Sequence, residues 1–186
     1  MSFSGQIKFL GHLVSASGVQ PLPDKVSAIT EWPTLHCLRD VRAFYGLVGY
    51  YCRFIEGYAT IAAEPLMRLT RKGTKFVWLS EADEAFTQLK AAMVEVPTLA
   101  FPCPDRPCIS DTDSSNVAYG SVMSQLIEGQ ECPIAFFSRV MSPTKQNYCS
   151  TRTELLAVIA SLQHFRHYLL NVPVILRTDH HSLKWL

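Results

Sequence analysis

The sequence predicts an α+β protein in which a small helical subdomain precedes an α/β domain built on a mixed sheet. Two observations support this prediction. Between about residues 23 and 96, apolar side chains recur at three- and four-residue steps, the spacing of helices that bury one face. In residues 108–125 the pattern changes to alternation, which indicates two strands joined by a tight turn. A further helix and strand follow.

The first residues predict a loose hairpin. Residues 7–18 alternate apolar and polar side chains, with a turn at 15–18 and a short return strand. A two-stranded hairpin of this size is marginally stable alone, so its stability depends on packing against other parts of the protein.

Those helices have recognisable starts and stops. Pro23 begins a short helix that ends before Pro33, and residues 35–54 form the next, with an apolar face. Another begins near Pro65. Residues 80–83, Ser-Glu-Ala-Asp, have the form of a capping box, and the helix they start ends before Pro97. The prolines at 97, 102, 104 and 107 then favour extended backbone, so residues 98–107 are expected to be a linker.

Three carboxylates stand out in the second half. Asp113 lies at the end of a predicted strand, and Asp179 ends a second one in the same Thr-Asp dipeptide. Glu154 falls in the first turns of the helix between them. A surface aspartate that begins a turn is the alternative interpretation of Asp113. Oxygen ligands brought together from strand ends and a helix are what a magnesium site needs, and a pair of such ions can cleave a phosphodiester.

Three motifs resemble, in order, the ribonuclease H domain of gypsy-type retroelement polyproteins: T-D-S-S, Y-C-S-T-R-T-E-L-L-A-V and R-T-D-H-H-S-L-K-W-L. The resemblance implies that Asp113, Glu154 and Asp179 are catalytic metal ligands. It also implies two Mg²⁺ ions, with Mn²⁺ as a substitute: Asp113 would bridge both, Glu154 would hold the one near the water, and Asp179 the other. Asp111, on the same strand face as Asp113, is interpreted as a solvated or backup carboxylate.

The first half resembles neighbouring parts of the same polyproteins. F-L-G-H-x-V-S-x-x-G is similar to the hairpin after the polymerase palm, and E-W-P-T, L-R-D-V-R-A-F-Y-G-L-V-G-Y-Y-C-R-F-I and F-V-W are similar to the thumb. We therefore expect a hairpin at 1–22, a thumb-like subdomain at 23–97, the linker at 98–107 and a truncated ribonuclease H-like domain at 108–186. The implied partners are an RNA–DNA hybrid or a template–primer duplex. The residues expected to contact phosphates are Arg68, Arg71, Lys72 and Lys75.

The resemblance also sets expectations about activity. The parent enzyme is an RNA-directed DNA polymerase and ribonuclease H, but this sequence has no adjacent aspartates, which the polymerase motif Y-x-D-D requires. The family's fourth ribonuclease H aspartate would follow Asp179, beyond the given residues, as would the rest of that domain and the integrase. We therefore expect no polymerase activity and no efficient cleavage by these residues alone. An inactive genomic remnant and a non-catalytic nucleic-acid- or protein-binding module remain the alternatives.

Composition adds few constraints. The 186 residues are 48% hydrophobic and carry a formal net charge of +1, so nucleic-acid binding must come from local patches. Six cysteines without a CxxC pair indicate a reduced, intracellular (cytoplasmic or nuclear) protein with no cysteine-bound metal. His164 and His167 are interpreted as a polar surface stripe. No apolar run reaches membrane-spanning length, and the first residues do not form a secretory signal.

Overall fold

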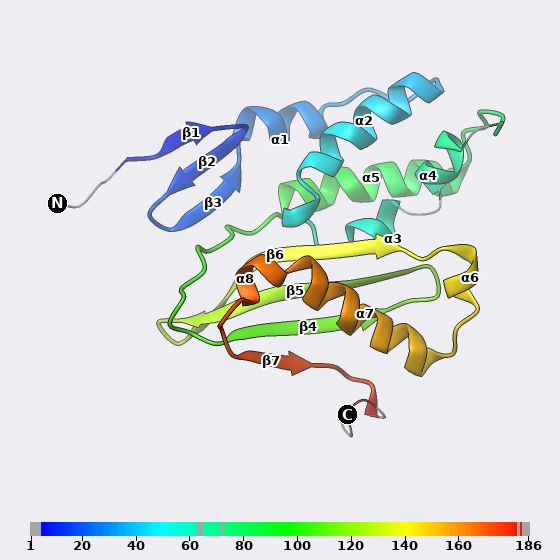
Figure 1. Cartoon of the computed structure of the whole chain (residues 1–186). Helices are drawn as coiled ribbons and strands as arrows, with labels where there is room; N and C mark the ends of the chain where they lie inside the picture. The colour runs from blue at the N-terminus through cyan, green and yellow to red at the C-terminus, as the bar shows by residue number, and fades with distance from the viewer. Residues whose placement is uncertain (1–4, 63–64, 72, 182, 184–186) are drawn as a thin grey trace.

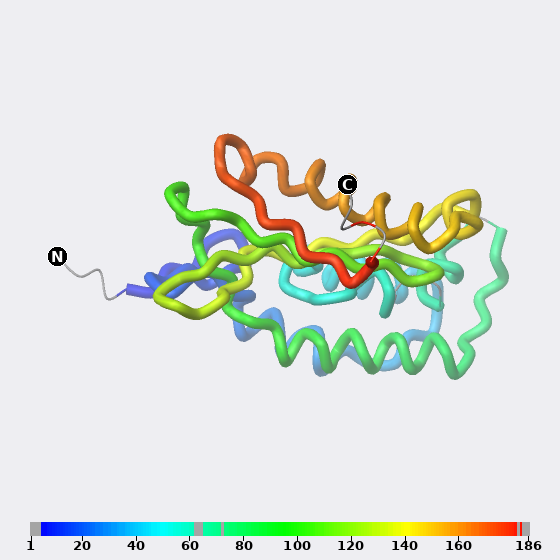
Figure 2. Tube along the Cα trace, turned by 90° about the horizontal axis from the view of Figure 1, so that it is seen from below, coloured from blue at the N-terminus to red at the C-terminus, as the bar shows by residue number. Residues whose placement is uncertain are grey.

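The computed structural model describes residues 5–62, 65–71, 73–181 and 183. A helical half covers one face of a four-stranded sheet, and a long helix covers the other face (Figures 1 and 2). The predicted α+β class is confirmed. None of the helices that the structure describes combines the length and the apolar content needed to cross a lipid bilayer.

The N-terminal segment is a three-stranded antiparallel sheet in place of the predicted two-stranded hairpin. Its strands are β1 (Ile7–Phe9), β2 (His12–Ser15) and β3 (Gly18–Pro21), in the order β1-β2-β3. The missed turn is Leu10–Gly11, where both residues have positive φ, 44° and 80°. Two successive residues of positive φ make the tight turn that suits a hairpin, so a run that alternates like one strand folds back on itself.

The helical half contains five α-helices and one 3-10 helix among the described residues. They are α1 (Pro23–Thr30), α2 (Leu38–Tyr50), η1 (Cys52–Phe54), α3 (Tyr58–Ala62), α4 (Pro65–Thr70) and α5 (Ser80–Val94). Fully buried side chains from several of these helices, among them Ile29, Phe44 and Leu89, form one core. The helix predicted at residues 35–54 corresponds to the shorter helix α2 and the separate 3-10 helix η1.

The capping box predicted at residues 80–83 is wrong. Leu79 is the N-cap of α5, in extended conformation, and no side chain caps the helix. Asp83 accepts a hydrogen bond from Trp78 Nε1 at 3.3 Å instead. The helix starts one residue earlier than the motif implies, which places Ser80 inside the first turn, where its hydroxyl cannot serve as the cap.

The second half is built on the strands β4 (Cys108–Ser114), β5 (Ala118–Ile127), β6 (Gln130–Val140) and β7 (Val174–Arg177). Their order is β6-β5-β4-β7: β4, β5 and β6 pair antiparallel, and β7 runs parallel to β4. The helices between β6 and β7 are α6 (Pro143–Gln146), α7 (Ser150–His164) and α8 (Arg166–Leu169). A parallel neighbour requires such a crossover, and α7 supplies it by lying across β4 and β5 (Figure 1).

The buried face of α7 consists of small and polar side chains. Thr153, Glu154, Ala157 and Ser161 are buried, whereas the apolar Ile159 is 46% exposed. Small side chains let the helix approach the sheet closely, and the larger apolar ones lie at the sides of that contact. One consequence is that an acidic residue, Glu154, enters the interface between helix and sheet.

The two halves are packed against each other. Phe136 of β6 belongs to the core of the helical half, and the backbone N–H of Ala59 in α3 donates to Ser138 Oγ at 2.8 Å. Between the halves, Leu99 is fully buried and pairs with Val19 of β3. At the same contact, a side chain on Gly18 (φ 136°) would lie 2.2 Å from the Leu99 carbonyl oxygen, so only glycine fits there. The proline-rich segment at 98–107 is thus fixed to its neighbours, and its predicted extended backbone is interrupted by a turn at residues 104–105, where the Arg106 N–H donates to the Cys103 carbonyl.

Candidate metal centre

Asp113 and Asp179 are brought to one edge of the sheet by the pairing of β4 with β7. The strands are parallel, with Asp111 opposite Arg177, so both chains leave the sheet in the same direction. Asp113 is the penultimate residue of β4, and Asp179 follows the end of β7 by two residues. Both carboxylates are exposed.

Glu154 approaches the same edge from α7. Its side chain is 6% exposed, and Oε1 accepts a hydrogen bond from Ser114 Oγ at 2.6 Å. The hydroxyl of Ser114 also lies 3.1 Å from Thr153 Oγ1, so the end of β4 is tied to the first turns of α7. The other oxygen of Glu154, Oε2, is buried and has no hydrogen-bond partner among the described residues. A buried carboxylate oxygen without a partner is costly.

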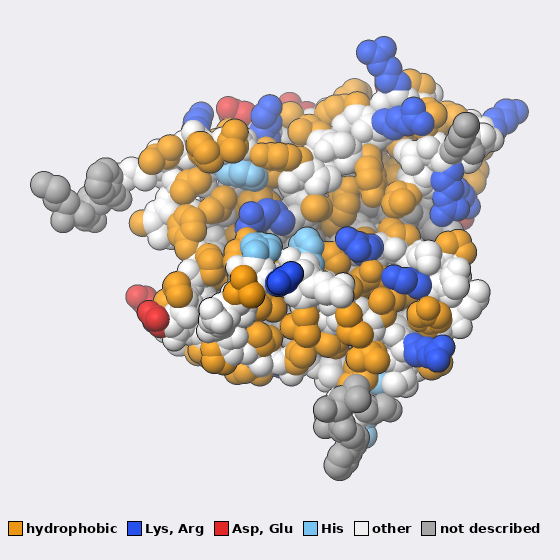
Figure 3. Space-filling model, viewed as in Figure 1, with side chains coloured by type: hydrophobic (Ala, Val, Ile, Leu, Met, Phe, Trp, Pro, Cys, Tyr) orange, Lys and Arg blue, Asp and Glu red, His pale blue; other side chains and the backbone are white. Residues whose placement is uncertain are grey.

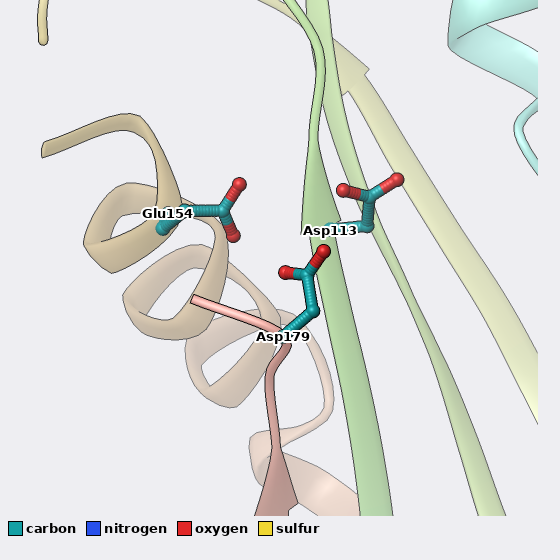
Figure 4. Close-up of side chains that lie close together, drawn as sticks. All are labelled: Asp113, Glu154 and Asp179. Carbon is teal, nitrogen blue, oxygen red and sulfur yellow. The ribbon is translucent and has the colours of Figure 1, made fainter. Parts of the chain in front are cut away.

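The three carboxylates converge (Figure 4). One oxygen each from Asp113, Glu154 and Asp179 lie within 4.8 Å of one another. Two oxygens on one Mg²⁺ can be no more than about 4.2 Å apart, because each bond is about 2.1 Å. Small side-chain adjustments, or a pair of ions about 3.5–4 Å apart, would satisfy the observed spacing. The residues therefore fit a divalent cation, which would also give Glu154 Oε2 a partner.

A second contact holds the Asp179 segment against α7. Thr151 Oγ1 and His180 Nε2 are 3.0 Å apart, and the backbone N–H of His180 donates to Thr178 Oγ1 at 3.1 Å. His180 directly follows Asp179 and therefore lies beside the cluster, where its ring contacts Thr151 in the first turn of α7. Together with Ser114, this contact ties all three carboxylate-bearing segments together.

Asp111, interpreted from the sequence as a solvated or backup carboxylate, is 35% exposed and is engaged in an ion pair that the sequence did not predict. Both of its oxygens accept hydrogen bonds from Arg177, from Nε and Nη2, each at 2.5 Å. Arg177 also reaches Glu131 of β6, at 2.5 Å and 3.1 Å, and Ser124 donates to the same carboxylate at 2.6 Å. The alternation of the strand correctly predicted that Asp111 and Asp113 share one face of β4. The cation that binds Asp111 is Arg177, which belongs to the neighbouring strand β7.

These hydrogen bonds shift two pKa values. The Arg177 guanidinium, and then the Ser124 hydroxyl, lower the pKa of Glu131 below its ordinary value. Asp111 and Glu131 raise the pKa of Arg177 further above its already high value. Glu131 and Arg177 are therefore both charged at neutral pH, and the hydrogen bonds of Arg177 join the edge strand β7 to β4 and β6.

Three of the four predicted phosphate-contacting residues are described: Arg68 lies on α4, and Arg71 and Lys75 follow that helix in the chain. Arg68 Nη2 is 3.5 Å from Glu81 Oε2, so its charge already has an acidic neighbour. Arg71 and Lys75 are exposed, and Lys72 lies outside the described residues.

A cleft of about 220 Å³ opens beside Asp113, between the two halves. The helical half contributes Glu56, Gly57 and Thr60, and the sheet contributes residues of β4 and β5 that include Asp111. Asp113 is thus reachable from this cleft, whereas Glu154 is anchored from the α7 side.

Sequence reasoning missed two contributors to the site, Ser114 and Arg177. From the sequence, Ser114 was interpreted only as a residue of the turn after the first strand. Because it follows Asp113 directly on that strand, its side chain must lie on the opposite face, the one covered by the helix that carries Glu154. That alternation was a usable signal. For Arg177 no comparable signal existed, because its partners Asp111 and Glu131 are 66 and 46 residues away in sequence.

Comparisons with known proteins agree with this architecture. Residues 78–176 match the family model described as an RNase H-like domain found in reverse transcriptase. The Drosophila melanogaster Pol polyprotein from transposon 297 is 40% identical over 182 residues, which are 97% of this chain and 17% of that protein. The Schizosaccharomyces pombe transposon Tf2-3 polyprotein is 31% identical over 181 residues, 96% of this chain and 14% of that protein. The chain thus spans less than a fifth of these relatives.

Solved structures share the fold. A foamy viral protease–reverse transcriptase in complex with RNA/DNA hybrid superposes with a TM-score of 0.81 at 19% identity, over 94% of this chain and 24% of that one. A second foamy viral structure, in complex with double-stranded DNA, gives the same score over 97% of this chain and 38% of that one. The helical half and the sheet are therefore arranged together as in these viral proteins.

Proposed function

Because the chain belongs to the family of RNase H-like domains found in reverse transcriptases, we propose that Asp113, Glu154 and Asp179 form the divalent-metal centre of a retroelement nuclease. Its substrate is the RNA strand of an RNA–DNA hybrid. The observation that carries the proposal is Glu154 Oε2, a buried carboxylate oxygen without a described partner in a side chain that points toward two other carboxylates (Figure 4). The solved complex of a similar fold with RNA/DNA hybrid motivates the choice of substrate.

The proposal also assigns roles to the two halves of the chain. A thumb-like unit at 23–97 and a ribonuclease H-like unit at 108–186, which are joined by the segment at 98–107, both contact the nucleic acid. The exposed cations on and after α4 contact phosphates at the thumb-like unit. A template–primer duplex, which has the same phosphate backbone, is the second nucleic acid that these surfaces would accept.

Each carboxylate has a distinct task in this centre. Asp113 and Asp179 are exposed and carry their charge at the mouth of the site, where metal and substrate enter. Glu154 is buried and oriented by Ser114, so its ligand oxygen is fixed before metal binds. When bound, a pair of Mg²⁺ ions, or Mn²⁺ in their place, supplies an activated water and stabilises the leaving oxygen.

The test combines metal binding with cleavage. Titration calorimetry with Mn²⁺ should show binding to the 186-residue chain, and Asp113→Asn should weaken it by more than the roughly 10–100-fold typical of losing an outer-shell partner. A labelled RNA–DNA hybrid incubated with Mg²⁺ or Mn²⁺ then reports cleavage, which we expect to be slow because three carboxylates leave most ligand positions to water.

Asp105→Asn is the matched control, because Asp105 lies in the proline-rich segment and outside the acidic cluster. It should bind Mn²⁺ like the unchanged chain. Equal Mn²⁺ affinities for Asp113→Asn and the control, or cleavage that survives Asp113→Asn, would refute the assignment of the centre.

A further inference from the structure

A second cleft, of about 470 Å³, lies where the helical half meets the free edge of β6. Three separate parts of the chain line it. They are the C-terminal end of α2 with η1, strand β6, and the turn between α7 and α8. Its volume corresponds to a hollow roughly 8 Å across, room for about two phosphates of one strand at 3.4 Å of axis per charge.

Basic side chains surround this cleft. Arg53 enters from η1, Arg139 from β6, and His164 and His167 from the end of α7 and from α8. Among the described residues that line it there is no aspartate or glutamate. In Figure 3, arginine, lysine and histidine side chains gather over η1, β6 and α7, and no acidic side chain is visible over that part of the face.

The charges of Arg53 and Arg139 have no acidic partner among the residues that the structure describes. No ion pair joins Arg53 or Arg139 to a carboxylate in the described part of the chain, in contrast to Arg68 and Arg177. The closest polar contact of Arg53 is a hydrogen bond of 3.4 Å to the Tyr168 hydroxyl, which carries no charge. Burial lowers the pKa of His164, and the charges of His167 and Arg139 lower it further.

Aromatic rings form the floor of the cleft. The His164 ring stacks on Phe137, with centroids 4.2 Å apart and planes at 20°, and the Arg139 guanidinium lies 5.7 Å from the same ring. Tyr50 is 52% exposed at the rim. The stacking holds His164 and Arg139 in place before any ligand arrives, so less conformational entropy is lost on binding.

We propose that this cleft binds the sugar–phosphate backbone of the RNA–DNA hybrid, at a fixed distance from the metal centre. The inference rests on the proposed function, because the hybrid is the substrate assigned there. Glu154 and His164 are ten residues apart on α7, which corresponds to about 15 Å along the helix axis. The backbone contact therefore lies about four base-pair steps of 3.4 Å from the carboxylates.

The test measures binding of a labelled hybrid by fluorescence anisotropy in EDTA, where no cleavage occurs. Arg53→Gln/Arg139→Gln should lower the slope of log affinity against log salt by about 1.8, at about 0.9 for each lost phosphate contact. If the two lines meet at 1 M salt, the same difference in slope lowers the affinity at 50 mM salt by about 200-fold. Lys8→Gln/Lys25→Gln removes the same charge from β1 and α1 and should keep the original slope.

Equal slopes for the arginine variant and the lysine control would overturn the inference. Tighter binding of an acidic peptide than of the hybrid, lost in the arginine variant, would also overturn it and assign the cleft to a protein partner. The readout needs no metal, so a failed Asp113→Asn test leaves this result standing. If the unchanged chain fails to bind hybrid at all, both the proposed substrate and this contact are wrong. Far-ultraviolet circular dichroism establishes that each variant is folded.

Discussion

The hydroxyl of Ser114 is the smallest group on which the metal centre depends. It donates to Glu154 Oε1 at 2.6 Å and so holds a buried carboxylate at the interface between β4 and α7. Asp113, one residue earlier, points the other way into the cleft between the halves. Two consecutive residues of one strand thus serve the same site from opposite faces, one as a ligand and one as the support of a ligand.

Removing that support should weaken metal binding without removing a ligand. In Ser114→Ala, Glu154 loses its only described hydrogen bond, and we expect Mn²⁺ affinity to fall about 10-fold, as for other outer-shell partners. The free energy of unfolding should fall by about 1–3 kcal/mol. Calorimetry and urea unfolding measure the two quantities. Ser142→Ala, at the exposed start of α6, is the control. Unchanged Mn²⁺ affinity in Ser114→Ala would show that Glu154 does not need this donor.

The edge strand β7 is held by its backbone pairing with β4 and by the hydrogen bonds of one side chain, Arg177. It has four residues, of which Ile175 and Leu176 are 50% and 41% exposed, so burial contributes little to its position. Arg177 joins it to Asp111 and Glu131 across the sheet. Since Asp179 follows β7 by two residues, this network also places one of the three carboxylates.

The network should make stability depend on pH. Arg177 lowers the pKa of Glu131 in the folded protein below the ordinary value of 4.5, so this stabilisation is complete above pH 4.5 and is lost as pH falls through the lowered value. We expect Arg177→Gln to flatten the decline in the free energy of unfolding between about pH 6 and 3, by about 1 kcal/mol or less because the pair is partly exposed. Urea unfolding at each pH measures it.

Arg166→Gln is the matched control for this experiment, because Arg166 forms no ion pair in the described structure. Its decline should parallel that of the unchanged protein. A decline in Arg177→Gln as steep as in this control would mean that Glu131 gains nothing from the arginine.

At the scale of the whole molecule, the helical half and the sheet form one packed body. Phe136 extends from β6 into the helical core, and the Ala59–Ser138 hydrogen bond and the Val19–Leu99 pairing add polar contacts. Both clefts beside this interface, the one next to Asp113 and the one between Arg53 and Arg139, take residues from both halves. Their geometry therefore depends on the halves staying together.

Phe136→Ala should destabilise both halves at once. Truncating a buried phenylalanine costs about 3–5 kcal/mol, and if the halves unfold together the loss is shared. Native-state hydrogen exchange should show amides of α5 and of β5 losing protection by the same amount. Phe101→Ala, at a side chain that is 47% exposed, should change neither. Loss of protection in only one of the two elements would show that the halves unfold separately.

Local rules were enough to predict the α+β class and most element positions, because periodicity marks helices and strands. The three carboxylates were identified through the resemblance of their surrounding motifs to a known family, and the structure brings them together. The parallel pairing of β4 with β7, which brings Asp113 and Asp179 to the same end of the sheet, joins segments more than 60 residues apart and was not predicted.

Tertiary structure alone decided which partners the charged and polar groups meet. The engagement of Asp111 by Arg177, the Leu10–Gly11 turn in the N-terminal sheet, the small-residue face of α7 and the basic cleft at β6 all depend on contacts between distant segments. The sequence shows which side chains can carry a charge. Whether a charge is neutralised, buried or accessible to a ligand depends on the residues that the fold places beside it.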